Sequence, residues 1–575
     1  MSDFKGVHRE CDIVMKGGIT SGVVYPLTVT EIARTYRFRN IGGASAGALA
    51  AAITAAAEHN RDRGGFERVL AIPEEVATKL RGFFQPVKAM KPVLDAILAL
   101  QDNKRGGWSR GWRAVRALLG GYWPWTVAGL VPGLVLGWFI RAHCGWAEAV
   151  LVLLACLFGV LAGIAWRLYR FVAIDLPANR FGLCTGRTMS GAAQEGLTDW
   201  LARTIDEVAG RDPEGDPLTF EQLWGPDRAK PRIRLDMMTT NLSMYRAHRL
   251  PLRTDIYKFR RSEFEELFPR RVVEYMVRAS RPVMVDGRPF EDYYKLPTGA
   301  KLPVVVAARM SLSFPGLIQA IPLYVRDFTL KARKDRAELR RCLFSDGGLT
   351  SNFPIHFFDR LLPSAPTFAV TLEPWRAAQH GPKRNERAYL PARAIENIDL
   401  PVYEIGSFPA FLMSLIDSAK GWQDTLQSTL PGYRERIVHI PLDYAHEGGF
   451  NLAMDEATVR ELVEYGRQAG EKVVTDFDFD EHRWRRFLVA GKRLEETLEQ
   501  MYNCYGEGDP EPFRAFLERY SRVPKAYKQN AAWLDSACSR FDAAMALAEA
   551  WREKPLFADG KIPRPESDLR ITPRY

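Results

Sequence analysis

The stretch of sequence that decides the fold is Cys11–Asn60, CDIVMKGGITSGVVYPLTVTEIARTYRFRNIGGASAGALAAAITAAAEHN. Its apolar spacing predicts a strand over Asp12–Met15, then a glycine turn and a helix, then a second short strand over Phe38–Ile41. A sharp turn and an alanine-rich helix over Ala46–His59 follow. Strands that alternate with helices in this way predict an α/β fold.

The sharp turn holds Gly43-Ala44-Ser45-Ala46-Gly47, which has the pattern G-x-S-x-G. At a strand-to-helix junction the flanking glycines allow a tight, strained turn that lifts the serine hydroxyl clear of the backbone. The helix that follows directs its first amides toward developing negative charge. The pentapeptide alone is a weak signal, but its position between a strand and a long helix makes Ser45 a candidate nucleophile.

A second glycine cluster, KGGITSG over residues 16–22, follows the first strand. The backbone N–H groups of such a loop can converge on one point and form an oxyanion hole. Phosphate binding is the competing function, but neither the G-x-x-x-x-G-K-[ST] order nor a G-x-G-x-x-G motif occurs in this loop. A plain glycine turn is the structural alternative.

A third element, FSDGG over residues 344–348, precedes Asn-Phe-Pro at 352–354. An aspartate at the end of a strand and beside two glycines is placed to take a proton from a serine hydroxyl, so Asp346 is a candidate base. An ordinary Asp-Gly turn is the alternative. His356 is the histidine nearest to Asp346 in the sequence, and we expect it to have a structural or surface role. No His, Cys, Asp or Glu cluster has metal-ligand spacing.

Two apolar runs interrupt an otherwise average composition. The 575 residues are 47% hydrophobic and 26% charged, with a mean hydropathy of -0.20, which excludes a disordered or low-complexity chain. Residues 121–140 and 149–166 contain no charged side chain, and as helices each is about 27 to 30 Å long, enough to cross a bilayer. With the short connection Arg141–Glu148, they predict a membrane hairpin with helices over 121–140 and 146–166. The alternatives are a buried helical pair in a soluble core and a re-entrant element.

Basic residues flank the hairpin on both sides. They are Lys104, Arg105, Arg110, Arg113 and Arg116 before it, and Arg167, Arg170 and Arg180 after it. This bias predicts that both flanks, and the core they join, lie on the cytoplasmic side of the membrane. The net charge of +10 suits an anionic bilayer, and because no nucleic-acid-binding motif accompanies it, we expect no nucleic-acid partner.

The three glycine-containing elements, in this order along the chain, resemble the patatin-like phospholipase family. The resemblance implies a three-layer α/β/α core, hydrolysis of lipid acyl esters by a Ser-Asp dyad, and no cofactor or metal. Its site residues would be the catalytic Ser45 and Asp346, the oxyanion-site residues Gly17, Gly18, Gly22 and Ala46, and the supporting glycines Gly43, Gly47, Gly347 and Gly348.

The chain departs from that family in its glycine loop. The family pattern is G-G-G-x-[RK]-G, whereas here Ile19 occupies the third glycine position and Ser21 the basic one. Lys16, which precedes the loop, can supply the missing positive charge. The resemblance covers residues 9–59 and 180–375, which is less than half of the chain.

The predicted organisation is one core interrupted by the hairpin. Residues 9–100 form the first part of the core, 101–175 the inserted hairpin, 176–450 the rest of the core, and 451–575 a helical C-terminal region. Three further segments carry predictions: a helical connection over 74–101 broken by Pro86 and Pro92, a basic run over 328–343, and a strand over 437–442 that extends the sheet.

Together these features predict a membrane-anchored lipid acyl hydrolase that resembles phospholipase A. Its expected partners are the bilayer and a membrane phospholipid or another acyl-ester lipid, and its helical C-terminal region allows a homo-oligomer. Two alternatives stay open. One is a hydrolase of a non-phospholipid ester such as a triglyceride, lysolipid or thioester, and the other is a catalytically idle membrane scaffold.

Overall fold

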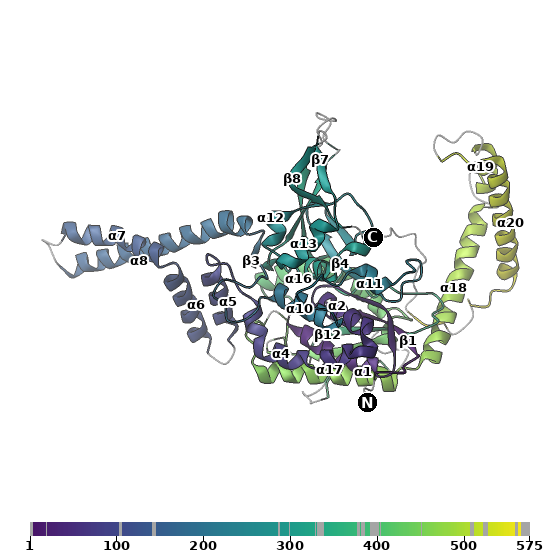
Figure 1. The fold of residues 1–575 in the computed structure, drawn as a ribbon, viewed down its shortest axis with the longest axis horizontal. Helices are drawn as coiled ribbons and strands as arrows, with labels where there is room; N and C mark the ends of the chain where they lie inside the picture. The colour runs from purple at the N-terminus through teal and green to yellow at the C-terminus, as the bar shows by residue number, and fades with distance from the viewer. Residues whose placement is uncertain are drawn as a thin grey trace.

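The computed structural model has a mixed α/β fold built around one large sheet (Figure 1). It describes residues 4–18, 20–102, 106–140, 145–285, 288–297, 299–327, 329, 339–376, 380, 386–391, 402, 404–444, 446–449, 451–505, 511–520, 527–557 and 562–564. The predicted α/β class is confirmed at this level, because parallel strands joined by helices make up one half of the sheet.

The strand order across the sheet is β13-β12-β1-β2-β4-β11-β10-β6-β8-β7, and β5 pairs with β4 beyond the end of β2. From β13 to β4 neighbouring strands are parallel, and from β11 to β7 they are antiparallel. The strands of this sheet are β1 (Glu10–Met15), β2 (Arg37–Gly43), β4 (Arg234–Asn241), β5 (Arg246–Leu250), β6 (Lys258–Arg260), β7 (Pro282–Val285), β8 (Arg288–Lys295), β10 (Ile321–Arg326), β11 (Leu339–Asp346), β12 (Thr367–Pro374) and β13 (Ile437–Leu442). A separate pair consists of β3 (Gly182–Cys184) and β9 (Gly316–Ile318). The predicted strand over 437–442 is confirmed as β13.

The central strands are buried on both faces. In β1, Ile13 and Met15 pack in the larger hydrophobic cluster, whereas Val14, between them, packs with Phe353 and Phe357 in a smaller cluster. Successive side chains of a strand point to opposite faces, so both faces of the parallel half are covered. This burial fits the apolar run Ile13–Met15 at the end of β1.

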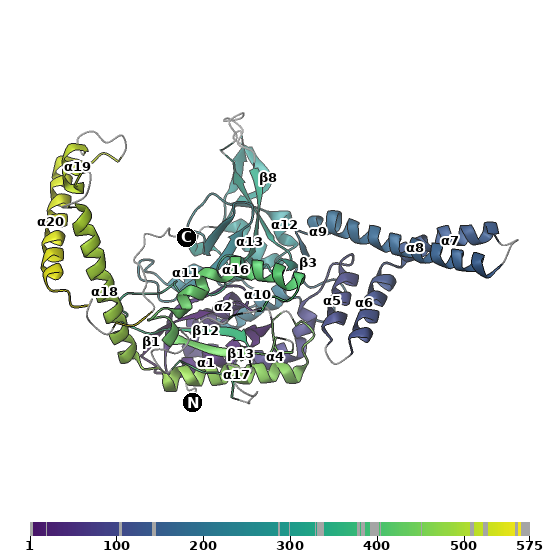
Figure 2. The same cartoon turned by 180° about the vertical axis from the view of Figure 1, so that it is seen from behind.

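Helices cover the two faces. The helix α2, which faces the viewer in Figure 1, packs on β2, whereas α16 lies on the opposite side and faces the viewer in Figure 2. The helices of the core are α1 (Tyr25–Ala33), α2 (Ala46–His59), α3 (Gly65–Val69), α4 (Ile72–Lys79), α5 (Lys91–Gln101), α9 (Leu176–Ala178), α10 (Leu197–Val208), α11 (Phe220–Trp224), α12 (Arg261–Glu265), α13 (Arg270–Arg278), α14 (Val304–Ser311), α16 (Phe408–Thr429) and α17 (Glu456–Asp476).

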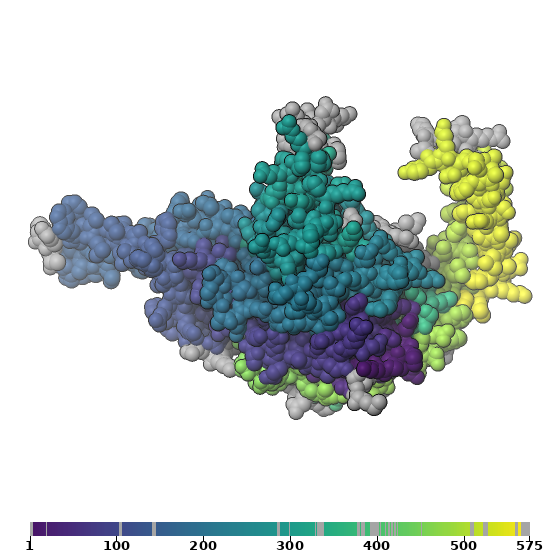
Figure 3. All heavy atoms as spheres, viewed as in Figure 1, coloured from purple at the N-terminus to yellow at the C-terminus, as the bar shows by residue number. Residues whose placement is uncertain are grey.

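Three helices leave the core on the side of α5. They are α6 (Gly107–Gly121), α7 (Trp123–Ile140) and α8 (Trp146–Arg170). The last two form an antiparallel pair that extends from the molecule as a rod (Figures 1 and 3). In the most apolar window of α7, 6% of the residues are buried, and in that of the stretch that begins with α8, none is. The two helices are therefore not the buried helical pair of a soluble core. Both helices are long and apolar enough to cross a membrane.

Glycines let α7 and α8 approach closely. A Cβ on Gly129 would lie 2.4 Å from the carbonyl oxygen of Gly159, and one on Gly159 would lie 2.0 Å from the carbonyl oxygen of Gly129. Small residues at such a crossing allow backbone contact between helices in a membrane. The predicted helices over 121–140 and 146–166 are confirmed with shifted ends, and residues 141–144 of the predicted connection lie outside the described residues.

The connecting segment 74–101 is helical at both ends, as predicted, but Pro92 does not break it. The helix α4 ends at Lys79, a short turn follows, and α5 begins at Lys91 with Pro92 in its first turn. Proline has no N–H to donate, and the first turn of a helix needs none, so Pro92 starts α5 instead of interrupting a helix.

The C-terminal region is helical, as predicted. Its first helix, α17, packs on α1 along the core, whereas the next three form an arm that projects away from it (Figure 2). The helices of this arm are α18 (Phe479–Tyr505), α19 (Phe513–Tyr520) and α20 (Ala531–Glu553). Most of the basic run over 328–343, namely 328 and 330–338, lies outside the described residues.

Candidate active site

The turn between β2 and α2 holds Ser45 in a strained conformation. Its backbone has φ 55° and ψ -128°, a positive φ that is rare for residues other than glycine. The turn is tight because Gly43 touches the backbone of Gly47, where a Cβ on Gly43 would lie 2.3 Å from the carbonyl oxygen of Gly47. Ser45 is buried at 4% exposure and sits directly before the first residue of α2. This is the geometry of a nucleophile elbow.

Asp346 ends β11, on the other side of β4 from β2. Gly43 pairs with Met237 on one edge of β4, and Asp346 pairs with Thr239 on the opposite edge. The ends of β2 and β11 therefore flank the same short segment of β4, two strand spacings of about 4.8 Å apart. The fold brings Ser45 and Asp346 to one region of the sheet although about 300 residues separate them in the sequence.

Hydrogen bonds fix the orientation of Asp346, which is 3% exposed. One carboxylate oxygen, Oδ1, accepts the amide N–H of Gly348 at 2.7 Å, and the backbone carbonyl accepts the hydroxyl of Thr240 at 2.9 Å. Gly347 packs against the backbone of β4, where a Cβ would lie 2.1 Å from the carbonyl oxygen of Met238. In the part of the chain that the structure describes, the hydroxyl of Ser45 and the carboxylate of Asp346 form no hydrogen bond with each other.

The glycine loop lies against both of these elements. A Cβ on Gly17 would lie 2.2 Å from Oδ1 of Asn352 and 2.8 Å from Cβ of Ser45. A Cβ on Gly348 would lie 2.6 Å from the same Asn352 oxygen and 2.7 Å from Oδ1 of Asp346. The side chain of Asn352 thus bridges the glycine loop and the Asp346 turn, and the two glycines make room for it.

The amides of the predicted oxyanion site differ in their availability. The N–H of Gly17 donates to the carbonyl oxygen of Asn352 at 2.9 Å, so Gly17 contributes space and not a free donor. Among the described residues, the amides of Gly18 and Ala46 have no acceptor, and Gly22 packs against Ala46. Ala46 is the first residue of α2, where the helix dipole favours negative charge. Ile19 lies outside the described residues.

Lys16, the cation expected beside the glycine loop, hydrogen-bonds to the neighbouring strand β12. The ammonium group of Lys16 donates to the carbonyl oxygen of Leu372, at 3.0 Å, on β12. Burial raises the pKa of Asp424, and the charge of Lys16 is one of the smaller effects that oppose this rise.

Two serines, at and just after the end of α14, accept hydrogen bonds from the backbone amides of Ser45 and Asp346, and sequence reasoning did not single them out as site residues. The hydroxyl of Ser311 accepts the amide N–H of Ser45 at 3.1 Å. The carbonyl oxygen of Ser313 accepts the amide N–H of Asp346 at 2.9 Å and the hydroxyl of Ser345 at 2.9 Å. The signal that could have identified them is the short Ser-Leu-Ser sequence at the end of α14.

A buried arginine, Arg309, anchors one of these serines, Ser313. The guanidinium of Arg309 is fully buried and donates to the hydroxyl of Ser313 at 2.7 Å and to two backbone carbonyls, of Thr185 at 3.0 Å and Gln319 at 3.1 Å. Burial lowers the pKa of Arg309 to about 9. Because a buried cation needs its hydrogen-bond acceptors to remain in place, Arg309 makes the position of Ser313 rigid.

Asp424, on α16, anchors the turn that carries Asn352. Its carboxylate accepts the hydroxyl of Ser351 at 2.9 Å and the amide N–H of Phe353 at 2.8 Å. Burial, the largest effect, raises the pKa of Asp424, and the hydrogen bonds from this turn lower it. Sequence reasoning missed Asp424 because nothing in its local sequence marks it.

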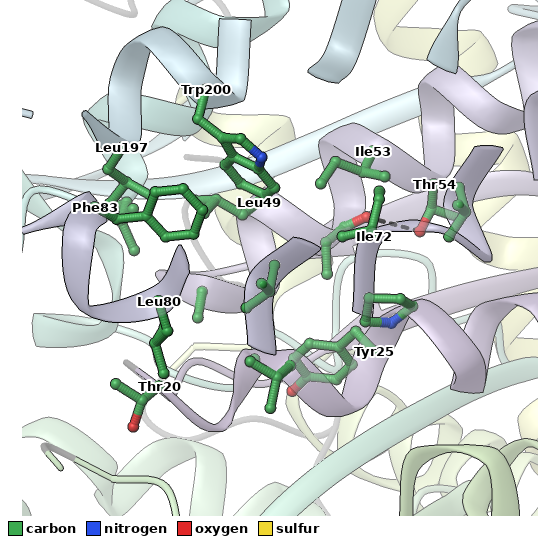
Figure 4. Close-up of a pocket in the computed structure, with 18 of the residues that line it drawn as sticks. Thr20, Tyr25, Leu49, Ile53, Thr54, Ile72, Leu80, Phe83, Leu197 and Trp200 are labelled. Carbon is green, nitrogen blue, oxygen red and sulfur yellow. Dashed lines mark hydrogen bonds between the residues drawn. The ribbon is translucent and has the colours of Figure 1, made fainter. Parts of the chain in front are cut away.

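An apolar pocket opens beside the elbow (Figure 4). It has a volume of about 100 Å³, and Gly22 and Ala46 of the predicted oxyanion site are part of its wall. Figure 4 shows side chains of α2, such as Leu49 and Ile53, facing Phe83 and Trp200 across this space. Its lining is almost entirely apolar, so the pocket suits a hydrocarbon chain.

None of the hydrogen bonds described above involves His356. Its ring packs edge-on against Phe357, and burial, with the charge of Arg249 second, lowers the pKa of His356 to about 4. It is therefore neutral at pH 7, as a core histidine would be. Among the residues that the structure describes, no three His, Cys, Asp or Glu side chains are grouped to hold a metal ion.

Comparisons with known proteins give one clear relative. No protein-family model matches the chain. A protein of Rhizobium meliloti (strain 1021) named RpoH suppressor is 34% identical to it over 651 aligned positions, which cover 99% of each chain. The crystal structure of VipD from Legionella pneumophila aligns with 96% of this chain and 87% of its own, with a TM-score of 0.29 and 15% identity. A TM-score this low supports no functional argument.

Proposed function

Because the chain belongs to the same family as the RpoH suppressor of Rhizobium meliloti, a name that specifies no reaction, we propose its function from its own residues. We propose that it is a patatin-like lipid acyl hydrolase, which cleaves acyl esters of membrane lipids through a Ser-Asp dyad. The observation that carries this proposal is the strained, buried Ser45 at the β2–α2 elbow, with Asp346 across β4 from it.

In this mechanism Ser45 Oγ attacks the acyl carbonyl carbon while its proton passes to the carboxylate of Asp346. The tetrahedral intermediate collapses, the alcohol leaves with the proton from Asp346, and the acyl group stays on Ser45. A water molecule then attacks the acyl-enzyme, with Asp346 again as the base. Proton transfer requires a hydrogen bond between the two side chains, and such catalytic bonds often tighten only when substrate binds.

Negative charge on the acyl oxygen would be held by backbone amides. The available amides of Gly18 and Ala46 support this role, and the dipole of α2 adds to it. Two preorganised donors of this type contribute roughly 3 to 4 kcal/mol each to lowering the barrier.

The apolar pocket supports an acyl-chain substrate. Its wall includes Ala46, so a chain lying in the pocket would present its carbonyl group near the elbow. A pocket with hardly any polar group gives affinity through apolar burial, about 0.8 kcal/mol per methylene. This favours fatty-acyl esters over short polar esters.

We also propose that the core has the three-layer α/β/α architecture of the patatin-like family. In this proposal α7 and α8 form a membrane-spanning hairpin that anchors it. Helices on both faces of the sheet support the layering. The exposed apolar surface of the two helices supports the anchor, as do Trp123, Trp138 and Trp146 near their ends. The basic flanks favour a cytoplasmic core, which would keep the enzyme close to its substrate.

The test is covalent labelling of the detergent-solubilised full chain with a fluorophosphonate. We expect labelling of the natural protein, its loss in Ser45→Ala, and a decrease in Asp346→Asn of roughly 10²- to 10⁴-fold in rate. Ser428→Ala is the matched control, because among the described residues the Ser428 hydroxyl bonds only to the carbonyl oxygen of Thr425 in its own helix. Absence of labelling in folded natural protein would exclude the hydrolase and leave the membrane scaffold.

A lipid panel identifies the ester. Fatty-acid release is measured from vesicles of phosphatidylcholine, from lysophosphatidylcholine and from emulsified triacylglycerol, with Ser45→Ala as the blank. Faster release from the diacyl phospholipid supports the proposal. Release confined to triacylglycerol or lysolipid would mean that the substrate is an ester other than a diacyl phospholipid. The proposed Ser-Asp dyad would be unaffected.

A further inference from the structure

A cationic cleft lies in the antiparallel half of the sheet, among β6, β7, β8 and β10. It has a volume of about 780 Å³. Four of its lining side chains are cations, Lys258, Arg281, Lys295 and Arg326, and Asp255 is the one acidic residue of its lining. The strands β7 and β8 rise from the core at the top of Figure 1, whereas α7 and α8 extend to the left.

Strand pairing places three of these cations on one face. Lys258 on β6 lies directly opposite Lys295 on β8, and on its other side it lies opposite Tyr324 on β10. Arg326 is two residues beyond Tyr324, so it projects from the same face. Like charges directly opposite each other on antiparallel strands destabilise a sheet, and a sequence selected for stability alone would avoid this pair.

Among the described residues of the lining, Asp255 is the one carboxylate, and it cannot balance four cations. None of the four forms an ion pair among the described residues, and Arg326 donates instead to the carbonyl oxygen of Met284 at 3.0 Å. Burial, the largest effect, lowers the pKa of Lys258, the charges of Arg326 and Lys295 lower it further, and the charge of Asp255 opposes them. Three carboxylates on or beside neighbouring elements, Asp292, Glu263 and Asp327, have cationic partners of their own, which are Arg260, Arg180 and Arg340.

We propose that this cleft binds a phosphate group, carried by an anionic lipid headgroup or free in solution. Four cations against one carboxylate leave three net positive charges, and a doubly charged phosphate would offset two of them. Arg281 and Arg326 offer planar forks that match phosphate oxygens, and Lys258 and Lys295 act as point charges between them. The apolar part of the cleft lining would pack against whatever carries the phosphate.

The cleft is separate from the candidate active site. Arg326 pairs with Leu339, the first residue of β11, and Asp346 is the last residue of the same strand. At about 3.4 Å per residue, the two ends of β11 are roughly 24 Å apart. The bound phosphate would therefore belong to a second molecule and not to the ester at Ser45, so this inference does not depend on the proposed hydrolase.

The test uses the full chain in neutral detergent and inorganic phosphate as the first probe. Thermal unfolding is followed against phosphate concentration, with sodium chloride added to keep the ionic strength constant. We expect a saturable rise in Tm for the natural protein and at least a tenfold weaker response in Lys258→Gln/Lys295→Gln. Without phosphate this variant should unfold at the same or a higher temperature, because the substitution relieves repulsion.

The matched control is Lys91→Gln/Lys230→Gln, which removes the same charge from two exposed positions outside the cleft. It should keep the response of the natural protein within about twofold. If the double variant in the cleft does not fold, Arg281→Gln takes its place. Ser45→Ala should show the same rise in Tm with phosphate as the natural protein. Phosphate binding and ester hydrolysis are thus tested independently.

A second probe separates the two sources of phosphate. Phosphatidic acid, with phosphatidylcholine as its neutral counterpart, is added to the same micelles. A rise in Tm with phosphatidic acid but not with inorganic phosphate assigns the cleft to a lipid headgroup, and the reverse assigns it to a soluble phosphate. The proposal is overturned if neither probe raises Tm, or if the cleft variant and the control lose the response equally.

Discussion

The amide N–H of Ser45 donates a hydrogen bond to the hydroxyl of Ser311 over 3.1 Å, and this bond joins the turn between β2 and α2 to the end of α14. The strained backbone of Ser45 has few neighbours that could hold it, because the turn itself consists of small residues. Ser311 is fully buried, so its hydroxyl is positioned by the surrounding core. The candidate nucleophile thus depends on a contact that lies 266 residues away in the sequence.

Ser311→Ala should lower kcat while KM changes little. The substitution leaves the buried N–H of Ser45 without its acceptor, which costs about 1 to 3 kcal/mol and loosens the elbow. We expect roughly a tenfold loss of kcat, because a small displacement of the nucleophile is costly in the transition state. The measurement is steady-state ester hydrolysis, with Ser428→Ala as the control. A loss that appears only in KM would assign Ser311 to substrate binding instead.

Gly17→Ala should damage the site far more than a glycine substitution elsewhere. The new Cβ would lie 2.2 Å from Oδ1 of Asn352 and 2.8 Å from Cβ of Ser45, so both side chains must move. We expect a destabilisation of about 1 to 3 kcal/mol from overpacking and loss of fluorophosphonate labelling.

Gly111→Ala is the matched control for this prediction. A Cβ at Gly111 meets no atom within 4 Å, and the residue lies in the middle of α6. It should leave labelling unchanged and stabilise the helix by up to about 1 kcal/mol. Equal Tm and equal labelling for both variants would contradict the close packing at Gly17.

Asp424→Asn should change how stability depends on pH. Burial raises the pKa of Asp424 above its ordinary value of 3.8, so the folded state holds the proton more tightly than the unfolded state. The contribution of Asp424 to stability is therefore full below pH 3.8 and is lost as the pH rises through the raised pKa. The variant cannot titrate at this position.

The Tm of Asp424→Asn minus that of the natural protein should therefore increase from about pH 4 to about pH 7. Thermal unfolding in a series of buffers measures this difference. Asp62→Asn, at an exposed position in the short turn of helix that follows α2, serves as the control and should give a nearly constant difference. A difference that decreases with pH would mean that the pKa of Asp424 is lowered in the folded protein.

Leu157→Arg should weaken membrane insertion if α8 crosses the bilayer. Leu157 lies near the middle of α8 and is 55% exposed, so an arginine there would meet lipid at a cost of about 2.5 to 3.5 kcal/mol. Resistance of the protein to carbonate extraction from membranes measures insertion. Leu362→Arg, at a position of the core that is 65% exposed, should extract as the natural protein does. Equal extraction of both variants would contradict a spanning α8.

Sequence alone predicted the parts whose structure depends on neighbouring residues. The elbow at Ser45 needs only small flanking residues between a strand and a helix, and the predicted helix over 46–59 is α2. The two apolar helices could likewise be read from length and charge. Pro92 shows a limit of this reading, because whether a proline breaks or begins a helix depends on where the helix starts.

The rest of the candidate site could not be predicted, because it consists of contacts between distant segments. Ser311 and Asp424 gain their roles only through contacts with Ser45 and Phe353. Asn352 belongs to the Asn-Phe-Pro sequence noted above, but its contact with Gly17 appears only in the fold. The cationic cleft is another such case. Lys258 and Lys295 become neighbours only through the pairing of β6 with β8.

The sequence by itself determined the α/β class, the strand-turn-helix around Ser45 and the two apolar helices, since backbone preference and apolar periodicity act over a few residues. The pairing of Ser45 with Asp346 as a candidate dyad rests on the resemblance to a known family and stays a prediction. Only the tertiary structure decided that β4 would lie between Ser45 and Asp346, and that the amide of Gly17 would be occupied while those of Gly18 and Ala46 are available. The physical reason is that hydrogen-bond partners and close packing are set by the order of strands in the sheet, which long-range burial selects and no short stretch of sequence encodes.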